Sequence, residues 1–349
     1  MTAPAPSTPA TIPPRVAVVG AGLSGLMCAR TMVDHGLSVS VFERARGLGG
    51  RCATRREGAW AFDHGAQYFT ARDPRLASLV EDWCARGVIA RWQGDVTVHE
   101  RGGARSASTK PASTERWVAV PGMNALAHDL AREIVVHLTT AIAAIVRDAD
   151  RWCVVADDGT SHGGFDLVVV AIPPAQAQAL LAPHVPELAR AAGGAVMHPT
   201  WATMLVLPSR PAVSWDAAFV NDDAILSWIC RDCSKPGRAP DGAETWVLHA
   251  THAWSAARLD ADKGTIAAAM TAAFAAIVGD GAAPLHAVAH RWGYAAAEAG
   301  AIDDSLFDPS ANLGAAGDWC SAPRIEGALV SGMDLAHRVC TATSPRARR

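Results

Sequence analysis

One segment, residues 15–51, constrains the fold of this chain more than any other. Val16–Val19 is an apolar, β-branched run, which predicts a strand buried on both faces. It leads directly into Gly20-Ala-Gly-Leu-Ser-Gly25, and helical periodicity then extends from Leu23 to His35 and stops at Gly36. A second strand, Ser38–Phe42, ends at Glu43. The order strand, glycine-rich turn, helix, strand predicts a βαβ unit of an α/β fold.

The spacing of the glycines predicts that this unit binds a dinucleotide. Gly20 permits the tight turn, Gly22 lets the backbone approach a pyrophosphate, and Gly25 lets the helix pack close to the strand. The helix N-terminus would then offer free N–H groups and a positive dipole end to the phosphates. Glu43 follows Gly25 at the distance where a carboxylate can accept hydrogen bonds from a ribose. The cofactor-binding residues expected here also include Ala21, Leu23, Ser24 and Arg44.

Size and charge limit the class of protein. A chain of 349 residues exceeds one simple core, so we expect two domains. Thirty-one basic and 34 acidic residues give a net charge of −3, which favours neither nucleic acid nor an acidic membrane as a partner. The longest apolar stretch, Thr265–Val278, is too short to span a bilayer and predicts a buried helix, which we expect to extend from Lys263 to Val278. We therefore expect a cytoplasmic monomer or homodimer.

The cysteines predict neither a disulfide framework nor a metal centre. Eight cysteines in a chain of this length, with an N-terminus that lacks the features of a signal peptide, fit free thiols. Cys230 and Cys233 form a CxxC, with His249 and His252 further along, but a lone CxxC is weak evidence for zinc or for redox chemistry. No metal is expected, and the role of the CxxC stays open.

The expected domains are discontinuous. We assign 15–72, 117–172 and 298–340 to a Rossmann-like domain for the dinucleotide, and 73–116 and 173–297 to a mixed-sheet α+β substrate domain. Pro173-Pro174 marks the crossing between them. Residues 1–14 and 341–349 are expected to be disordered tails, and the polar excursion Arg91–Ser113 has no assignment.

Two further segments point to a flavin and to a family. Gly47-Leu-Gly-Gly-Arg51 would let the chain pass close to an extended cofactor, which favours FAD over NAD. Phe62-Asp-His-Gly-Ala-Gln-Tyr-Phe-Thr-Ala-Arg-Asp-Pro74 then resembles the bacterial renalase family, within the monoamine-oxidase-like flavoproteins. In that family this loop runs beside the flavin. The resemblance therefore adds the expected cofactor contacts Gly49, Gly50, Arg51, Gly65, Ala66, Gln67, Tyr68, Phe69 and Thr70.

The later motifs support the same resemblance, which covers nearly the whole chain. Trp117-Val-Ala-Val-Pro-Gly-Met123 resembles the family's PGM element, and Ile142 falls on the strand that passes the adenine in the superfamily. Near the C-terminus, a strand runs into Gly317-Asp318, where the aspartate of related enzymes binds the ribityl or pyrophosphate part of FAD. The following helix would point its N-terminus at N1 of the flavin, where a helix dipole stabilises the reduced anion. These motifs predict contacts from Gly317, Asp318, Glu326, Gly327 and Ala328.

The substrate domain is expected to cover the flavin with a sheet. Arg291-Trp-Gly-Tyr294 is similar to an RW-x-Y element of bacterial renalases, so Trp292 is the candidate ring that holds a planar substrate against the flavin. Gly293 replaces a larger residue that is common in relatives. Tyr294, Trp201 and His64 are the other candidate substrate contacts.

The resemblance implies an FAD-dependent oxidase, with FAD held noncovalently. A hydride would pass from a small planar substrate to flavin N5, so no protein side chain is predicted to be catalytic, and O2 would be reduced to hydrogen peroxide. The expected substrates are the 2- and 6-dihydro isomers of NAD(P)H. These are good hydride donors, which suits a chain that shows no evident buried acid–base pair.

Two alternatives stay open. Amine oxidases of the monoamine-oxidase type usually keep a lysine near N5, whereas Thr200–Leu207 has none and the three lysines all fall in polar loop or helix-start contexts. A flavin desaturase or tailoring oxidase of a specialised metabolite is the other alternative. The sequence does not decide the true substrate or the electron acceptor.

Overall fold

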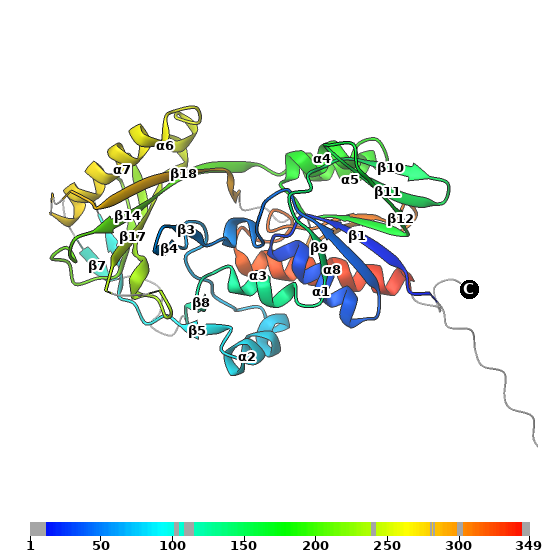
Figure 1. The fold of residues 1–349 in the computed structure, drawn as a ribbon, viewed down its shortest axis with the longest axis horizontal. Helices are drawn as coiled ribbons and strands as arrows, with labels where there is room; N and C mark the ends of the chain where they lie inside the picture. The colour runs from blue at the N-terminus through cyan, green and yellow to red at the C-terminus, as the bar shows by residue number, and fades with distance from the viewer. Residues whose placement is uncertain are drawn as a thin grey trace, which may run out of the picture.

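The computed structural model describes residues 12–100, 105–107, 115–238, 242–279, 281, 283–298 and 303–343. It consists of two α/β domains, each built on its own large sheet, which lie side by side along the long axis of the molecule (Figure 1). Most of the expected tail 1–14 lies outside the described residues, as do residues 344–349.

The first domain is built on a six-stranded sheet with strand order β19-β20-β13-β1-β2-β9. Its centre is β1, which pairs in parallel with β2 and β13, as the βαβ pattern predicts. Strand β20 pairs in parallel with β13, so a segment near residue 314 lies two strands from β1. The strands are β1 (Arg15–Val19), β2 (Ser38–Phe42), β9 (Val135–His137), β13 (Leu167–Val170), β19 (Leu306–Asp308) and β20 (Leu313–Ala315).

Helices cover one face of this sheet. Val16 and Val18 of β1 face a core shared with α1 (Leu23–Asp34), α3 (Ala125–Leu130) and α8 (Ile325–Thr343). Helices α1 and α8 pack directly against each other, as blue and red ribbons in Figure 1. Since α8 continues to Thr343, the expectation that residues 341–343 belong to a disordered tail is wrong.

The other face is covered by a small sheet and two helices. Ala17 and Val19 face a second core, which includes the antiparallel sheet of β10 (Ile142–Asp148), β11 (Arg151–Ala156) and β12 (Ser161–Phe165). Helices α4 (Pro174–Leu181) and α5 (Pro186–Gly193) share this core. We expected residues 174–193 in the substrate domain, but their apolar faces pack on the six-stranded sheet, so the chain crosses over only after α5.

The second domain is built on a seven-stranded, mixed sheet with strand order β18-β14-β17-β16-β15-β6-β7. Helix α7 (Lys263–Val278) covers its outer face and has the bounds that the sequence predicts. Two elements of the Arg91–Ser113 excursion form the edge of this sheet, while residues 101–104 and 108–114 lie outside the described part. The strands are β6 (Val96–His99), β7 (Arg105–Ala107), β14 (Met197–Leu207), β15 (Ala217–Val220), β16 (Leu226–Arg231), β17 (Glu244–Ala250) and β18 (His286–Ala297).

Short elements connect the two domains. A hairpin of β3 (Arg55–Glu57) and β4 (Trp60–Phe62) precedes the loop 63–70, and β5 (Ile89–Arg91) pairs with β8 (Trp117–Ala119). The remaining elements are η1 (Gly50–Cys52), η2 (Pro74–Leu76), α2 (Ala77–Ala85), η3 (Asp232–Ser234) and α6 (His252–Ala256). Within the described residues, no helix is long and apolar enough to cross a membrane.

Candidate functional site: a cavity between the two domains

A cavity of about 1070 Å³ lies between the domains. The first domain contributes the glycine turn after β1, the end of β2, the loops 49–52 and 65–68, and residues 316–325. The second domain contributes side chains from β14 to β18. Because ligand sites usually measure about 300–1,000 Å³, this cavity has room for an extended molecule.

The glycine turn forms an open cradle at the start of α1. Gly20 has a positive φ of 106°, and a Cβ at Gly25 would overlap the carbonyl oxygen of Gly20, so α1 must pack this closely on the turn. At Gly22, by contrast, a Cβ would meet no protein atom within 4 Å. No side chain caps the N-terminus of α1, so its first N–H groups remain available to a ligand at the cavity wall.

Glu43 is held by two backbone amides. Its Oε2 accepts a hydrogen bond from Ala21 N at 2.8 Å, and its Oε1 accepts one from Ala45 N at 2.8 Å. The carboxylate lines the cavity and is largely buried. Each carboxylate oxygen has further acceptor capacity, so Glu43 can accept hydroxyl hydrogen bonds from a ligand.

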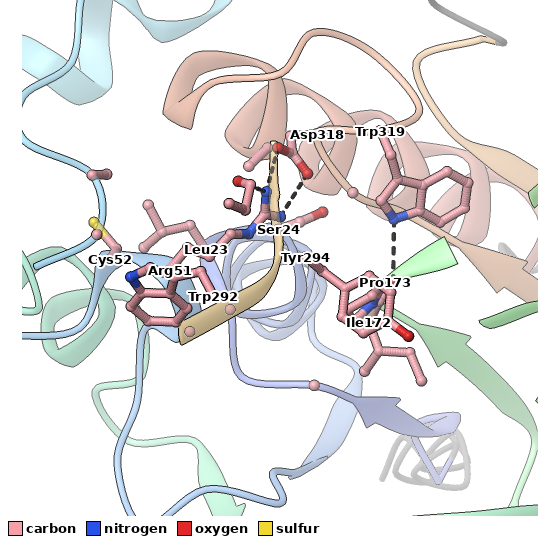
Figure 2. A pocket seen from close by; sticks show the side chains of 18 of the residues that line it. Leu23, Ser24, Arg51, Cys52, Ile172, Pro173, Trp292, Tyr294, Asp318 and Trp319 are labelled. Carbon is pink, nitrogen blue, oxygen red and sulfur yellow. Dashed lines mark hydrogen bonds and ion pairs between the residues drawn. The ribbon is translucent and has the colours of Figure 1, made fainter. Parts of the chain in front are cut away.

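The loop 49–51 runs alongside the glycine turn and positions an ion pair. Gly49 N donates to Ala21 O at 2.9 Å, and Gly49 and Gly50 both have positive φ. Arg51 then makes a bidentate pair with Asp318, with both N···O distances 2.7 Å (Figure 2). We expected each of these side chains to bind the cofactor; both line the cavity, but here they pair with each other. Arg51 also donates to Ala295 O of β18 at 3.1 Å, which links the two domains.

Most of the predicted site residues converge on this one cavity. Its wall includes Gly20, Gly22, Leu23, Ser24, Glu43, Arg44, Gly49, Gly50, Arg51, Gly65, Ala66, Gln67, Tyr68, Ile142, Gly317, Asp318, Ala328, Trp292 and Tyr294. Segments from both ends of the described chain therefore meet at one site, as the motifs require.

Four of the predicted cofactor contacts lie outside the wall. Ala21 is fully buried and acts through its amide on Glu43. Gly25 serves the helix packing described above. Phe69 pairs with Trp117 through two backbone hydrogen bonds, which turn the chain away from the cavity before Thr70. The structure therefore does not bring Phe69 and Thr70 to the cavity wall, and their direct contact with a cofactor stays a prediction.

Glu326 and Gly327 also lie outside the wall. The Oε1 atom of Glu326 accepts from Arg72 N at 2.5 Å and from Asp73 N at 2.6 Å, so this buried carboxylate anchors the loop 72–73 rather than a ligand. A Cβ at Gly327 would overlap the carbonyl oxygen of Ala322, so this glycine permits a tight turn before α8. Arg324 and Ile325 face the cavity instead.

The prediction for Trp201 is wrong because of strand alternation. Trp201 is almost fully buried in the core beneath α7, and its Nε1 donates to Arg258 O at 3.0 Å. Successive side chains of a strand point to opposite faces, so its neighbour Thr200 faces the cavity. Thr200 pairs in register with Trp292 of β18.

His64 lies behind the wall rather than in it. Its carbonyl oxygen accepts from Trp292 Nε1 at 3.0 Å and from His249 Nε2 at 3.2 Å. Its ring packs against His290 and Trp292, with centroid distances of 4.7 and 4.8 Å. His64 therefore orients the aromatic wall, and its contact with a substrate stays a prediction.

Two histidines of this wall, His249 and His290, are neutral near pH 7. Burial lowers the pKa of His249 to about 4 and that of His290 to about 4. Because a carbonyl oxygen only accepts hydrogen bonds, His249 must carry its proton on Nε2, which leaves Nδ1 as an acceptor. Burial also lowers the pKa of His64 to about 3, and its Nδ1 has no partner. The sequence motifs did not indicate His249 or His290 as wall residues; the alternation of β17 and β18 is the signal that could have found them.

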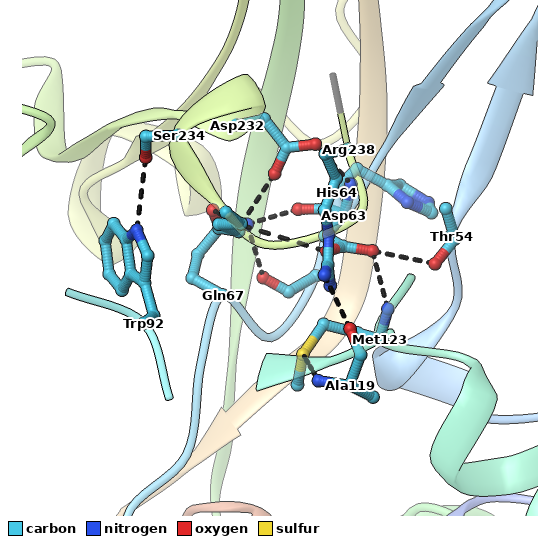
Figure 3. A network of polar contacts seen from close by, with 12 residues as sticks. Thr54, Asp63, His64, Gln67, Trp92, Ala119, Met123, Asp232, Ser234 and Arg238 are labelled. Atoms are coloured by element: carbon cyan, nitrogen blue, oxygen red, sulfur yellow. Dashed lines mark hydrogen bonds and ion pairs between the residues drawn. The ribbon is translucent and has the colours of Figure 1, made fainter. Parts of the chain in front are cut away.

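A buried network of four charged side chains lies behind the loop 63–67, and no sequence motif indicated it (Figure 3). Lys235 Nζ lies 2.6 Å from Asp232 Oδ1 and 3.9 Å from Asp63 Oδ2, and Arg238 donates to Asp63 Oδ2 from Nε at 2.8 Å. All four side chains are at most 1% exposed. Lys235 does lie in the loop that follows η3, as its polar context predicts, but it is buried there, and it forms with Asp232 a buried acid–base pair that was not evident in the sequence.

The network holds Gln67 in one orientation. Lys235 Nζ donates to Gln67 Oε1 at 2.9 Å, while Gln67 Nε2 donates to the carbonyl oxygens of Asp63 and Gly65. Burial raises the pKa of Asp232, and the Lys235 ammonium opposes this shift. Although burial opposes its charge, the adjoining carboxylates, Asp232 first, hold the pKa of Lys235 above its usual value. Gln67 is the member of this group that reaches the cavity wall.

The cysteines do not form a metal centre in the described part of the chain. Cys230 is buried in β16, and Cys233 lies near Glu244, with Sγ 3.7 Å from Oε2. Among the described residues, no cluster of three or more His, Cys, Asp or Glu side chains could hold a metal ion.

Solved structures show the same overall fold. A protein given the provisional name protoporphyrinogen oxidase, from Exiguobacterium sp., superposes with a TM-score of 0.76 at 14% identity, over 94% of this chain and 99% of that chain. Cyclohexylamine oxidase from Brevibacterium oxydans superposes with a TM-score of 0.74 at 15% identity over the same shares. At such identities the similarity concerns the fold.

Sequence relatives match only a short stretch. Protoporphyrinogen oxidase 2 from Arabidopsis thaliana is 41% identical over 68 residues, which are 20% of this chain and 13% of the relative. The 15-cis-phytoene desaturase from Synechococcus elongatus is 37% identical over 70 residues, 20% of this chain and 15% of the relative. The chain therefore matches less than a sixth of the length of either relative.

Family models account for most of the chain. Residues 18–83 match the NAD(P)-binding Rossmann-like domain, which agrees with the cradle at Gly20–Gly25. Residues 109–340, more than half of the chain, match the flavin containing amine oxidoreductases. The open glycine turn, Glu43 and the large cavity are suited to bind the flavin of that family. This protein is a flavoprotein oxidoreductase and belongs to the flavin containing amine oxidoreductase family.

Proposed function

We propose that this protein is an oxidase of planar hydride donors whose reacting ring is uncharged, and that its substrates are the 2- and 6-dihydro isomers of NAD(P)H. The reaction is the one that the resemblance to the renalase family implies. When bound, FAD supplies the two-electron acceptor, and O2 takes the electrons onward to give hydrogen peroxide. The observation that carries the proposal is the chemistry of the wall formed by the seven-stranded sheet.

That wall is mostly aromatic; among the described residues it carries no carboxylate, and its charged side chain is that of Arg291. It presents Trp292, Tyr294 and His290 from β18, Thr200 from β14, His249 from β17, and Trp228 and Phe219 from β16 and β15. An ammonium substrate is best bound beside an anion, whereas a neutral dihydropyridine ring needs flat, apolar surfaces. Because His249 and His290 have pKa values near 4, the wall stays uncharged at these positions at neutral pH.

The chain's own residues position the reactants rather than exchange protons. The aromatic wall offers flat, apolar faces, and His64 fixes the indole of Trp292 through its carbonyl oxygen. A dihydronicotinamide is already a good hydride donor, so orientation is the main requirement for its oxidation. We also propose that the substrate is a small molecule and that the protein has neither nucleic acid nor a membrane as a partner. We propose further that the protein is a cytoplasmic monomer or homodimer.

FAD would be held noncovalently along the first domain. The turn Gly20–Ser24 would bind the pyrophosphate of FAD, and Glu43 would bind a ribose. The side chains of Arg51 and Asp318 would then rearrange to contact the polar ribityl and pyrophosphate part of the cofactor. Cys52 lines the cavity, but burial raises the pKa of its thiol, and Sγ donates to Met123 O at 3.5 Å. A neutral, hydrogen-bonded thiol is a poor nucleophile, which supports noncovalent binding.

Amine oxidation is the second candidate, and two observations favour it. The buried Lys235 removes the argument that the chain lacks a lysine near this site, because it bonds to Gln67 of the cavity wall. The unprotonated Nδ1 of His249 could also accept a hydrogen bond from an amine. Solved structures with the same fold include a cyclohexylamine oxidase and a putrescine oxidase.

Anaerobic reduction of the purified holoenzyme separates the two candidates. We expect 2- and 6-dihydroNAD to bleach the flavin absorbance rapidly, while ordinary NADH and a panel of primary amines do not. Bleaching by an amine with no response to either isomer would overturn the proposal. As a matched pair, Trp292→Phe should keep the apparent substrate affinity within about threefold, and Trp292→Leu should weaken it about tenfold, because only the first keeps an aromatic face.

A further inference from the structure

We infer that the cavity contains a second ring-binding subsite, formed by Tyr68, Phe219 and Trp228, about 10–14 Å from Trp292. Three rings from three different segments meet there. The Phe219 and Trp228 rings have centroids 4.7 Å apart at an interplanar angle of 63°, and those of Tyr68 and Trp228 are 5.9 Å apart at 47°. All three side chains line the cavity, and none of them was predicted as a substrate contact.

The register of the sheet places this subsite on the same wall as Trp292. Trp228 of β16 pairs with Phe219 of β15 on one side and with His249 of β17 on the other, so the three side chains share a face. Strand β14, with Thr200, separates β17 from β18. Neighbouring strands lie about 4.8 Å apart, so the three steps from β16 to β18 span about 14 Å.

The loop 65–68 gives an independent measure of the same distance. At one end, a Cβ at Gly65 would lie 3.3 Å from the ring of Trp292. At the other end, Tyr68 packs against Trp228. Three extended residues cover about 10 Å. The loop therefore runs along the wall and contacts both ring sites, which places them in one continuous cavity.

The chemistry of the subsite selects an uncharged planar group. Trp228 is 7% exposed, Phe219 and Tyr68 are half-buried, and no Asp or Glu of the described wall lies on β15 or β16. Arg116 and Trp92 pack on Tyr68, with the guanidinium carbon 5.6 Å from the ring centre and the indole 5.9 Å away, and neither lines the cavity. The best ligand thus carries a second aromatic or planar apolar group, joined by a spacer to the ring that lies at Trp292.

Binding of two uncharged probes to the holoenzyme tests the subsite without turnover. The probes are 4-butylbenzamide and 4-(4-phenylbutyl)benzamide, which share a first ring and spacer and differ in the second ring. By isothermal titration calorimetry, we expect the second ring to tighten binding about 10- to 30-fold, as burial of a phenyl group does. Equal affinities of the two probes would overturn the inference.

Two variants locate the effect. Trp228→Leu keeps the apolar core filled but removes the flat ring, so the advantage of the two-ring probe should fall below about threefold. Trp254→Leu removes a tryptophan outside the cavity wall and should keep the full advantage. An advantage that persists in Trp228→Leu would refute the assignment. Should Trp228→Leu fail to fold, Tyr68→Leu tests the same subsite from the loop side, with the same expected loss.

The second ring-binding subsite extends the proposed function to longer substrates. The binding test above does not depend on the proposed function, whereas a test with compounds that reduce the flavin rests on it. In turnover, 1-(4-phenylbutyl)-1,6-dihydronicotinamide should have about a tenfold lower KM than the 1-butyl compound. Failure of both compounds to reduce the flavin would refute the proposed function alone. Equal KM values with rapid reduction would refute the subsite alone.

Discussion

Replacement of Lys235 by methionine should lower the free energy of unfolding, because Lys235 is part of the buried charged network behind the loop 63–67. The substitution keeps most of the side-chain volume and removes one of two cations that face two carboxylates. Asp63 retains Arg238, but Asp232 loses its contact at 2.6 Å while it stays fully buried. Removal of one partner of a buried ion pair costs about 3–5 kcal/mol, because the other charge stays in a medium that solvates it poorly.

The size of the effect can be expressed as a melting temperature. An unfolding entropy of about 2.1 cal/mol/K per residue gives about 0.7 kcal/mol/K for 349 residues, so we expect a decrease of about 4–7 °C. The loss should depend on pH. In the variant, burial keeps the folded-state pKa of Asp232 above its unfolded value. The folded state then binds more protons, so the variant is most stable below the unfolded pKa and loses stability as pH rises.

Differential scanning fluorimetry at pH 5 and pH 8 measures both effects. Lys235→Met should lie further below the wild type at pH 8 than at pH 5. The double variant Lys235→Met/Asp232→Asn should recover more than half of the loss at pH 8, because it removes the unpaired charge and keeps the shape. A pH-independent loss, or no recovery in the double variant, would refute the reasoning.

Three further changes test the cofactor cradle and the wall. Gly22→Ala meets no protein atom, so the apoprotein should keep its melting temperature, while flavin content after purification should fall at least tenfold; normal flavin content would contradict the assigned cradle. Glu43→Ala leaves two backbone amides without their acceptor and should lower the free energy of unfolding by about 1–3 kcal/mol in urea titrations, whereas Glu43→Gln should lose less. Since the pKa values of His249 and His290 are lowered to about 4, protons bind preferentially to the unfolded state below about pH 6.5, so the urea midpoint should fall from pH 7 to pH 5. A midpoint that rises over this range would contradict the neutral wall.

Local sequence patterns predict the parts of this fold that depend on near neighbours. The turn at Gly20–Gly25 and the contact of Glu43 with it lie within one βαβ unit, where spacing determines geometry. Helix α7 was predicted to the residue because its Ala-rich run begins at Asp262, which caps it, and ends at Gly279. The Asp318 segment was predicted through a motif that marks the end of a buried strand.

The errors concern the direction of side chains and contacts between distant segments. Trp201 and Thr200 are adjacent, and the phase of β14 alone decides which one faces the cavity. Lys235 follows the polar residues of η3 and resembles a surface lysine, yet Asp63 and Gln67, about 170 residues away, enclose it. No local pattern contains that information, because burial here results from the docking of one domain on the other.

The position of β20 and α8 has a consequence for biosynthesis. The cavity wall needs both the turn at Gly20 and the segment at Asp318, which a ribosome makes about 300 residues apart. At about 5–20 residues per second, about 15–60 s pass between the translation of the glycine turn and that of the segment at Asp318. Between the translation of β13 and that of β20, about 7–30 s at the same rate, β13 has no partner on its β20 side, and its apolar strand edge is exposed to other nascent segments. The complete flavin site therefore forms only late in translation, after the segment at Asp318 has been made.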